Sequence, residues 1–177
     1  RVTELKEGDY VARISKIVAE EKSQSIDPGS INGIVKKGGR YTVKSRNISR
    51  SNFIKLPRKT SPELLEFIGL IVSEGSIDKR GDGLSFANKD AALRVRFKTL
   101  CTDLFDIKHF GEDIEKISIY SKTLVEYLKI LGFENGKKLV IPCYFFKLPK
   151  DEIRAFVSGY FECDGTVSVM KLNGIKY

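Results

Sequence analysis

The sequence predicts an α+β fold in which buried helices alternate with antiparallel β-hairpins. Residues 61–74 are apolar on nearly every side of a predicted helix, and residues 151–164 form a second, mostly apolar helical segment. Short alternating segments at 76–88 and 107–121 are typical of hairpins. The chain has 177 residues, a size at which roughly 70% of the unfolded surface is buried on folding, and 41% of its residues are hydrophobic.

The N-terminal part is predicted to be the least regular. Residues 2–17 contain a polar turn followed by the alternating segment YVARISKIV, which favours a short strand. Residues 20–40 are rich in Ser, Gly and Lys and include Asp27-Pro28-Gly29, so we expect a loop or linker there. The segment RYTVKSRN, which begins at Arg40, alternates again and predicts a strand.

A helix is predicted to begin at residue 61 with clear boundary signals. Ser61 can cap its N-terminus, Pro62 suits the first helical position, and Glu63 and Glu66 complement the positive helix end. The helix is expected to end at Gly75, because glycine suits the left-handed position that ends a helix and turns the chain into a strand.

The elements that follow are predicted from turn residues and helical spacing. Their order is a hairpin with its turn at 81–83, a helix over 90–105, a hairpin over 107–121 and a helix over 122–132. Asp151 can then cap the last helix, which is expected to end at Gly165.

The positive charge is concentrated in the first third of the chain. The net charge is +8, and residues 1–60 hold 14 Lys+Arg against 6 Asp+Glu, whereas residues 61–177 are balanced. No acid occurs between Asp27 and Glu63. Such a run, interleaved with aromatic residues, favours nucleic acid over the alternative of a solvated basic loop. The predicted phosphate contacts are Lys36, Lys37, Arg40, Lys44, Arg46 and Arg50.

The rare residue types exclude several kinds of site. The single histidine, His109, excludes zinc–His clusters and other chemistry that needs two histidines in this chain. Cys101, Cys143 and Cys163 form no CxxC pair, which argues against a disulfide scaffold and fits a cytoplasmic location. No apolar run approaches the about 20 residues that span a bilayer, so no membrane partner is expected.

One pattern occurs twice, 90 residues apart. Residues 69–77 read GLIVSEGSI and residues 159–167 read GYFECDGTV. In each copy, a small residue is followed four positions later by another, then by an acid, a glycine and a hydroxyl residue. Gly69 and Ser73 share one helix face, as do Gly159 and Cys163. Because small residues let helix backbones approach closely, we predict that the two helices pack through these faces.

Each copy also places an acid at a helix C-terminus, Glu74 in the first and Asp164 in the second. The helix dipole disfavours a carboxylate there by about 0.3–1 kcal/mol, and packing the helices together brings like charges close. A divalent cation would offset both effects, and oxygen ligands favour Mg²⁺ (or Mn²⁺) over zinc. A cation beside a basic surface is typical of phosphodiester hydrolysis. The alternative for either acid alone is a solvated side chain beside a glycine.

The two copies resemble the paired LAGLIDADG motifs of homing endonucleases. FIGLIVSEGSI is similar to the first motif of archaeal intein endonucleases, and FVSGYFECDGTV is similar to the second. The segment GKKLVIP at 136–142 resembles the family's lysine segment, in which Lys138, or its neighbour Lys137, would polarise the attacking water. Separately, ELKEGDYV at 4–11 is similar to a block of the intein splicing (Hint) domain.

The resemblance implies an αββαββα half-unit whose antiparallel strands form a saddle in the DNA major groove. Residues 1–20 would be a Hint-like splicing segment, 21–60 a basic DNA-binding arm, 61–149 the first half-unit, and 150–177 the second motif helix and the start of a second half-unit. Glu74 and Asp164 would bind Mg²⁺ together with backbone carbonyls near Ser73 and Cys163. The residues expected to read double-stranded DNA are Lys79, Arg80, Asn88, Lys108 and Lys116.

The predicted function is site-specific, Mg-dependent cleavage of double-stranded DNA by the endonuclease domain of an intein. Only residues 166–177 follow Gly165 of the second motif, so we expect the second half-unit to be supplied in cis by a longer chain or by a second chain. The chain as given is expected to bind DNA and at most to nick it. Two alternatives stay open: a catalytically inactive DNA-binding remnant or regulator, and an N-terminal segment that serves splicing while its charge is incidental.

Overall fold

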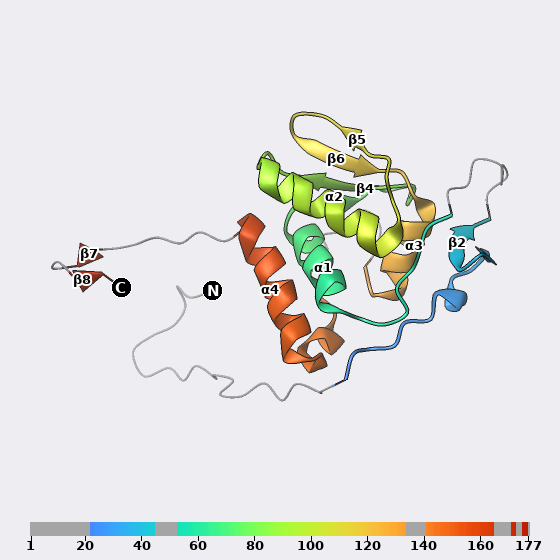
Figure 1. Cartoon of the computed structure of the whole chain (residues 1–177), viewed down its shortest axis with the longest axis horizontal. Helices are drawn as coiled ribbons and strands as arrows, with labels where there is room; N and C mark the ends of the chain where they lie inside the picture. Colours follow the sequence, from blue (N-terminus) through green and yellow to red (C-terminus); the bar gives the residue numbers. More distant parts are fainter. Residues whose placement is uncertain (1–21, 45–52, 134–140, 165–170, 173–174, 177) are drawn as a thin grey trace.

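The structure is a computed structural model that describes residues 22–44, 53–133, 141–164, 171–172 and 175–176. Figure 1 shows a body in which helices lie against a sheet, with a small hairpin at one side. Within these described segments, no helix is long and apolar enough to cross a membrane. The predicted strand in residues 2–17 lies outside the described residues.

The body of the protein consists of two repeats of one helix and two strands, closed by a helix, as the α+β prediction requires. The elements are α1 (Pro62–Glu74), β3 (Gly75–Ile77), β4 (Leu84–Ala87), α2 (Ala91–Phe105), β5 (Gly111–Glu112), β6 (Lys116–Ile119) and α3 (Lys122–Ile130). A 3-10 helix (Cys143–Lys147) and α4 (Lys150–Asp164) follow, and the short strands β7 (Lys171–Leu172) and β8 (Ile175–Lys176) pair with each other.

The predicted starts of α1 and α2 are confirmed by their capping contacts. The Ser61 hydroxyl accepts a hydrogen bond from the Leu64 amide at 3.3 Å and so begins α1. The Asp90 carboxylate accepts one from the Leu93 amide at 2.9 Å and begins α2. Asp106 ends α2 in the left-handed region, with φ of 57°.

Two other boundary predictions are wrong. Asp151 does not cap the last helix, because α4 begins at Lys150 and holds Asp151 in its first turn. Gly75 ends α1 with an extended backbone, φ of −93°, and not in the left-handed region.

The two predicted hairpins join into one antiparallel sheet with the order β3-β4-β6-β5. Side chains alternate across it, so that one face is apolar and buried under the helices. That inner face consists of Ile77, Leu84, Phe86, Ile117 and Ile119. The outer face carries small and polar side chains instead: Ser76, Ser85, Ala87, Lys116, Ser118 and Tyr120.

A chain of aromatic contacts holds the helices on the sheet. The Phe97 ring of α2 stacks on Phe86 of β4 at 4.5 Å and on Phe67 of α1 at 5.7 Å between ring centroids. Phe67 also meets Phe105 edge-on at 5.1 Å. All four side chains are fully buried, so this cluster contributes strongly to the stability of the body.

The prediction of a loop or linker over residues 20–40 is wrong in part. This stretch contains a 3-10 helix (Pro28–Ser30) and the strand β1 (Ile34–Lys37), which pairs with β2 (Arg40–Val43). The turn between them is Gly38-Gly39, with φ of 55° and 77°. Positive φ at both central residues is the geometry of a tight hairpin turn, which glycine adopts without strain.

The N-terminal segments are also packed against the body. Ile26, Ile31, Tyr41, Ile54 and Leu56 are buried and belong to the same apolar core as α1. We refer to described residues 22–44 and 53–60 as the basic arm. Because its apolar side chains lie in the common core, the arm has a fixed position on the body.

Candidate functional site

The two repeated segments lie on helices that cross with their backbones in contact. A Cβ atom on Gly69 would collide with the Phe156 carbonyl oxygen and lie 2.8 Å from the Tyr160 amide nitrogen. A Cβ atom on Gly159 would lie 2.5 Å from the Glu66 carbonyl oxygen. Only glycine fits at either position, so the predicted packing of α1 on α4 through their small residues is confirmed at this pair.

The contacts at this crossing are related by an exchange of the two helices. Gly69 faces the carbonyl of the residue three positions before Gly159, and Gly159 faces the carbonyl of the residue three positions before Gly69. Adding 90 to one residue number of a contact and subtracting 90 from the other therefore gives the second contact. The sequence repeat corresponds to an approximate two-fold relation between α1 and α4.

The acids end these two helices, and α1 and α4 run in the same direction (Figure 1). Glu74 is the last residue of α1 and is partly buried. Asp164 is the last residue of α4, and its side chain lies outside the described part. Since each acid follows its crossing glycine by five residues, the structure brings the two helix ends to the same side of the crossing.

The oxygen atoms at these helix ends are of the kind that binds a hard divalent cation. The last carbonyls of a helix have no intrahelical partner, which makes them available as ligands. The Ser73 hydroxyl donates to the carbonyls of Gly69 and Leu70 at 3.2 and 2.9 Å, which holds this side chain against its own helix. Among the described side chains, no cluster of three His, Cys, Asp or Glu residues occurs that could hold a metal.

Several predicted site residues cannot be placed. The catalytic candidates Lys137 and Lys138 and the phosphate contacts Arg46 and Arg50 lie outside the described residues. Cys163 is partly buried in α4 and packs against the core, as expected of the helix interface. Its role as a backbone ligand stays a prediction.

The residues predicted to read DNA differ in where they lie. Lys79 and Arg80 are exposed in the turn between β3 and β4. Lys116 is exposed on the outer face of β6, and Lys108 is exposed before β5. Asn88 has another role: its side-chain oxygen accepts a hydrogen bond from the Asp90 amide at 2.8 Å, which holds the entry to α2.

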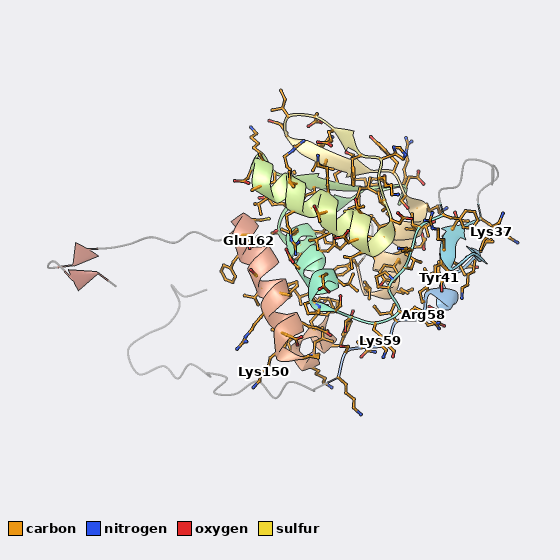
Figure 2. All side chains as sticks on the ribbon, viewed as in Figure 1. Lys37, Tyr41, Arg58, Lys59, Lys150 and Glu162 are labelled. Atoms are coloured by element: carbon orange, nitrogen blue, oxygen red, sulfur yellow. The ribbon has the colours of Figure 1, made fainter. Side chains whose placement is uncertain are left out.

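The basic arm presents several cations to solvent. Lys36, Lys37, Arg40 and Lys44 are exposed. Figure 2 shows Lys37 at the hairpin, Arg58 and Lys59 along the lower edge of the view between the hairpin and α4, and Lys150 and Glu162 toward opposite ends of α4. The Lys36 ammonium lies 5.7 Å from the centre of the Tyr41 ring, a cation–π contact.

Backbone contacts attach this arm to the helices. The Lys55 amide donates to the Phe105 carbonyl at 2.9 Å, and the Tyr127 hydroxyl donates to the Pro57 carbonyl at 2.9 Å. Arg40 also forms an ion pair with Asp106. These contacts attach the arm to the C-terminal end of α2 and to α3.

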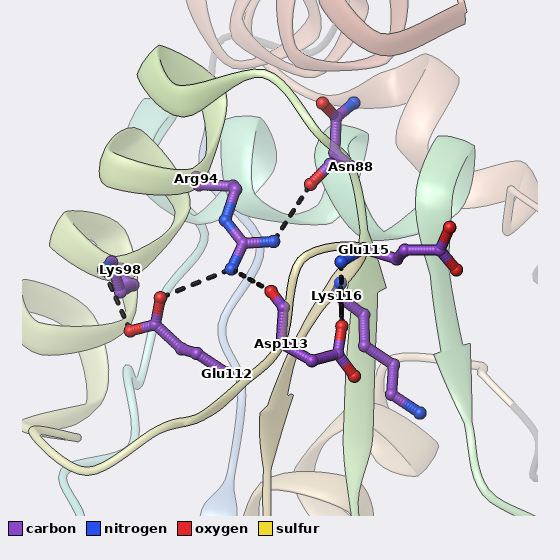
Figure 3. Close-up of polar contacts among 7 residues, drawn as sticks. All are labelled: Asn88, Arg94, Lys98, Glu112, Asp113, Glu115 and Lys116. Carbon is purple, nitrogen blue, oxygen red and sulfur yellow. Dashed lines mark hydrogen bonds and ion pairs between the residues drawn. The ribbon is translucent and has the colours of Figure 1, made fainter.

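A polar network that the sequence did not reveal surrounds the tip of the β5–β6 hairpin (Figure 3). Arg94 donates to the carbonyls of Asn88 and Asp113 at 3.2 and 2.7 Å and pairs with Glu112 at 3.4 Å. Lys98 pairs with the same carboxylate at 3.0 Å. Hydrogen bonding from Lys98 lowers the pKa of Glu112 below its usual value. Glu112 is thus paired with two cations of α2, whereas the Asp113 carboxylate accepts the amides of Glu115 and Lys116, both at 2.8 Å.

No known protein family model matches the chain. The chain is 36% identical over 112 residues to the replication factor C small subunit of Methanocaldococcus jannaschii, covering 59% of this chain. It is 29% identical over 126 residues to one of the subunits of the A-type ATP synthase of Pyrococcus abyssi (66% of this chain), and 27% identical over 179 residues to the RNA polymerase subunit Rpo1C of M. jannaschii (94%). It spans 6%, 12% and 20% of the lengths of these three proteins.

Proposed function

We propose that the chain is part of a LAGLIDADG homing endonuclease within an intein, and that it cleaves phosphodiester bonds of double-stranded DNA with Mg²⁺. The observation that carries the proposal is the exchange-related crossing at Gly69 and Gly159, which is followed on each helix by an acid five residues later. A solvated carboxylate without a function would account for one such acid. It does not account for two acids at related positions of two helices in backbone contact.

The element order supports the same proposal. The sequence of helix, two strands, helix, two strands and helix from Pro62 to Ile130 agrees with the αββαββα half-unit that the motifs imply. Its outer sheet face is polar, with small serines at its centre and cations beside it, as a surface that lies on DNA requires.

The comparisons support an inserted element. The three matched proteins belong to a replication factor, an ATP synthase and an RNA polymerase, and each matches this chain over a small part of its length. One segment shared by otherwise different proteins is the pattern that an intein inserted into each of them would produce. The basic arm would then belong to the same insertion.

The chain's own residues have separable tasks in this proposal. Bound Mg²⁺ would supply charge stabilisation at the phosphate and activation of water. Glu74 and Asp164 would hold it with carbonyl oxygens of the two helix ends. The glycine crossing sets the position of those ends, while Lys79, Arg80 and Lys116 contact the DNA from the sheet. Lys138, or Lys137, would orient the attacking water.

The proposal is tested with plasmids that carry randomised inserts, incubated with the protein and Mg²⁺. We expect nicked or linear products that depend on Mg²⁺, and we expect Glu74→Gln and Asp164→Asn to abolish cleavage while DNA binding persists. Glu63→Gln is the control, because Glu63 is an exposed acid at the opposite end of α1. Binding without cleavage by the unaltered chain would indicate a DNA-binding remnant, and no binding would overturn the proposal.

The exposed side of α4 supports the need for a second half-unit. Phe67 and Ile71 of α1 are fully buried, whereas the residues 90 positions later, Val157 and Phe161, are 41% and 60% exposed. They border an apolar groove of about 310 Å³. We expect the chain to self-associate in sedimentation as concentration rises, and Phe161→Ser to prevent it. A chain that is monomeric at every concentration would contradict self-association through this groove.

A further inference from the structure

A hollow of about 310 Å³ lies where the basic arm meets the body, away from the helix ends that carry the acids. Arg40 and Phe53 line it from the arm, and Lys108, His109 and Tyr120 line it from the segments that flank β5 and β6. Ile119 of β6 also lines the hollow. It is paired with Leu84 of β4, whereas Lys116 and Ala87 are paired at the other end of these two strands. The hollow therefore adjoins the end of the sheet nearest the β3–β4 turn.

The charge of this hollow is positive. Arg40 and Lys108 share one carboxylate, that of Asp106, with the Lys108 pair at 3.5 Å. The Asp106 side chain is only 13% exposed, whereas the side chains of Arg40 and Lys108 are 48% and 68% exposed. Two accessible cations thus face solvent over one largely covered acid.

Tyr120 adds an exposed aromatic ring beside these cations. It is 79% exposed, and it continues the outward-facing positions of β6. Its ring lies over two glycines. A Cβ atom on Gly111 would lie 3.2 Å from the ring, and a Cβ atom on Gly83 would lie 3.7 Å from it. The ring therefore rests on the sheet surface with an open face. Cations next to an open aromatic face are the combination that binds nucleic-acid strands.

We propose that this hollow binds the sugar–phosphate backbone of a DNA strand where it leaves the outer sheet face toward the basic arm. Arg40 and Lys108 contact the phosphate and Tyr120 packs on the adjoining sugar. This inference rests on the proposed DNA-binding function and adds to it a backbone contact distant from the cleavage site. Contacts of this kind fix the register of a protein on its duplex.

The test measures binding of the full chain to a random-sequence DNA duplex by fluorescence anisotropy at several NaCl concentrations. We expect Lys108→Ala to reduce the slope of log affinity against log salt by about 1, because one phosphate contact is lost. Tyr120→Ala should weaken binding several-fold without changing the slope. Lys89→Ala is the matched control: the Lys89 side chain is 73% exposed and its ammonium pairs with one acid, Glu115, at 3.2 Å, but it lies at the other end of the sheet.

A variant that gains affinity removes misfolding as an explanation. Asp106→Asn keeps a residue that tolerates the left-handed backbone, and it releases both cations from their acid, so we expect tighter binding and a steeper slope. Equal slopes for Lys108→Ala and Lys89→Ala, or no gain with Asp106→Asn, would overturn the inference alone. A chain that binds no duplex at low salt would overturn the proposed function as well.

Discussion

Gly69 of α1 and Gly159 of α4 meet without any side chain between their backbones, and each occupies the place where a methyl group would strike the other helix. Neither glycine is needed for a turn, since both lie within helices. A glycine in a helix interior costs roughly 0.5–1 kcal/mol relative to alanine. This cost is accepted because only glycine allows the two helices to approach so closely.

Substituting Gly159 with Ala should therefore separate the helices. The added methyl group lies 2.5 Å from the Glu66 carbonyl oxygen, and a backbone atom cannot move aside as a flexible side chain can. We expect a loss of unfolding free energy of about 1–3 kcal/mol or more, despite the higher helix propensity of alanine. Chemical denaturation measures it. Ser158→Ala, at an exposed neighbouring position, is the control, and an equally small effect for both would contradict the close contact.

The aromatic cluster should carry a large part of the stability of the body. Phe97 is fully buried and stacks on both Phe86 and Phe67, so Phe97→Ala leaves a cavity between helix and sheet. The expected loss is about 3–5 kcal/mol in urea unfolding. Val95→Ala, on the same helix at a position that is 61% exposed, should change stability by less than about 0.5 kcal/mol. Comparable losses for the two variants would be inconsistent with this core.

Stability should fall in alkali because of buried phenols. Burial raises the pKa of Tyr144 to about 12 from an ordinary value of 10, so the folded state holds the phenol proton more tightly than the unfolded state. This contribution is complete below pH 10 and is lost as pH rises from 10 toward 12. Burial also raises the pKa of Tyr127 and of the Cys101 thiol.

Tyr144→Phe isolates this effect. The variant loses the hydrogen bond to the Leu131 carbonyl, so it should be less stable than the unaltered chain at neutral pH. Its unfolding free energy should then fall less steeply with pH, because one of the raised phenols is gone. Urea titrations at about pH 8 and about pH 11 compare the two slopes. Parallel slopes would show that Tyr144 is not buried in solution.

The basic arm should account for much of the salt dependence of DNA binding. Replacing Lys36, Lys37 and Lys44 together with Gln removes three exposed cations on or directly after the β1–β2 hairpin, and we expect the salt slope to fall by up to about 3. Replacing Lys89, Lys147 and Lys150 instead is a control with the same change of net charge. Deletion of the arm is a poorer test, because Tyr41 and Leu56 are part of the core.

Local signals predicted most of the body, since its boundaries depend on residues close in sequence. Ser61 and Asp90 cap the helices they precede, and glycines occupy the turn between β3 and β4. The repeat predicted the helix crossing, because small residues at related positions have few other uses. The contact between the helices at Gly69 and Gly159 could therefore be predicted from the sequence alone.

The structure of the basic arm and the polar contacts of the body could not be predicted from local sequence patterns. β1 has the sequence IVKK, which does not alternate, and it is a strand because Gly38-Gly39 closes it onto β2. Ile26 and Ile54 are buried by elements distant in sequence. Asn88 was predicted to face DNA, yet a partner two residues away uses its oxygen. Such choices depend on tertiary contacts that no local pattern encodes.

The glycine crossing also fixes the relative register of α1 and α4. In a helix each residue advances about 1.5 Å and turns about 100°, so a slip by one residue would present a side chain where a glycine now meets backbone. The two helices can therefore fit in one register only, and each acid stands five residues beyond it. The Gly69–Gly159 contact therefore determines the relative position of the two helix ends that carry the carboxylates, independently of the sheet and of any bound ion.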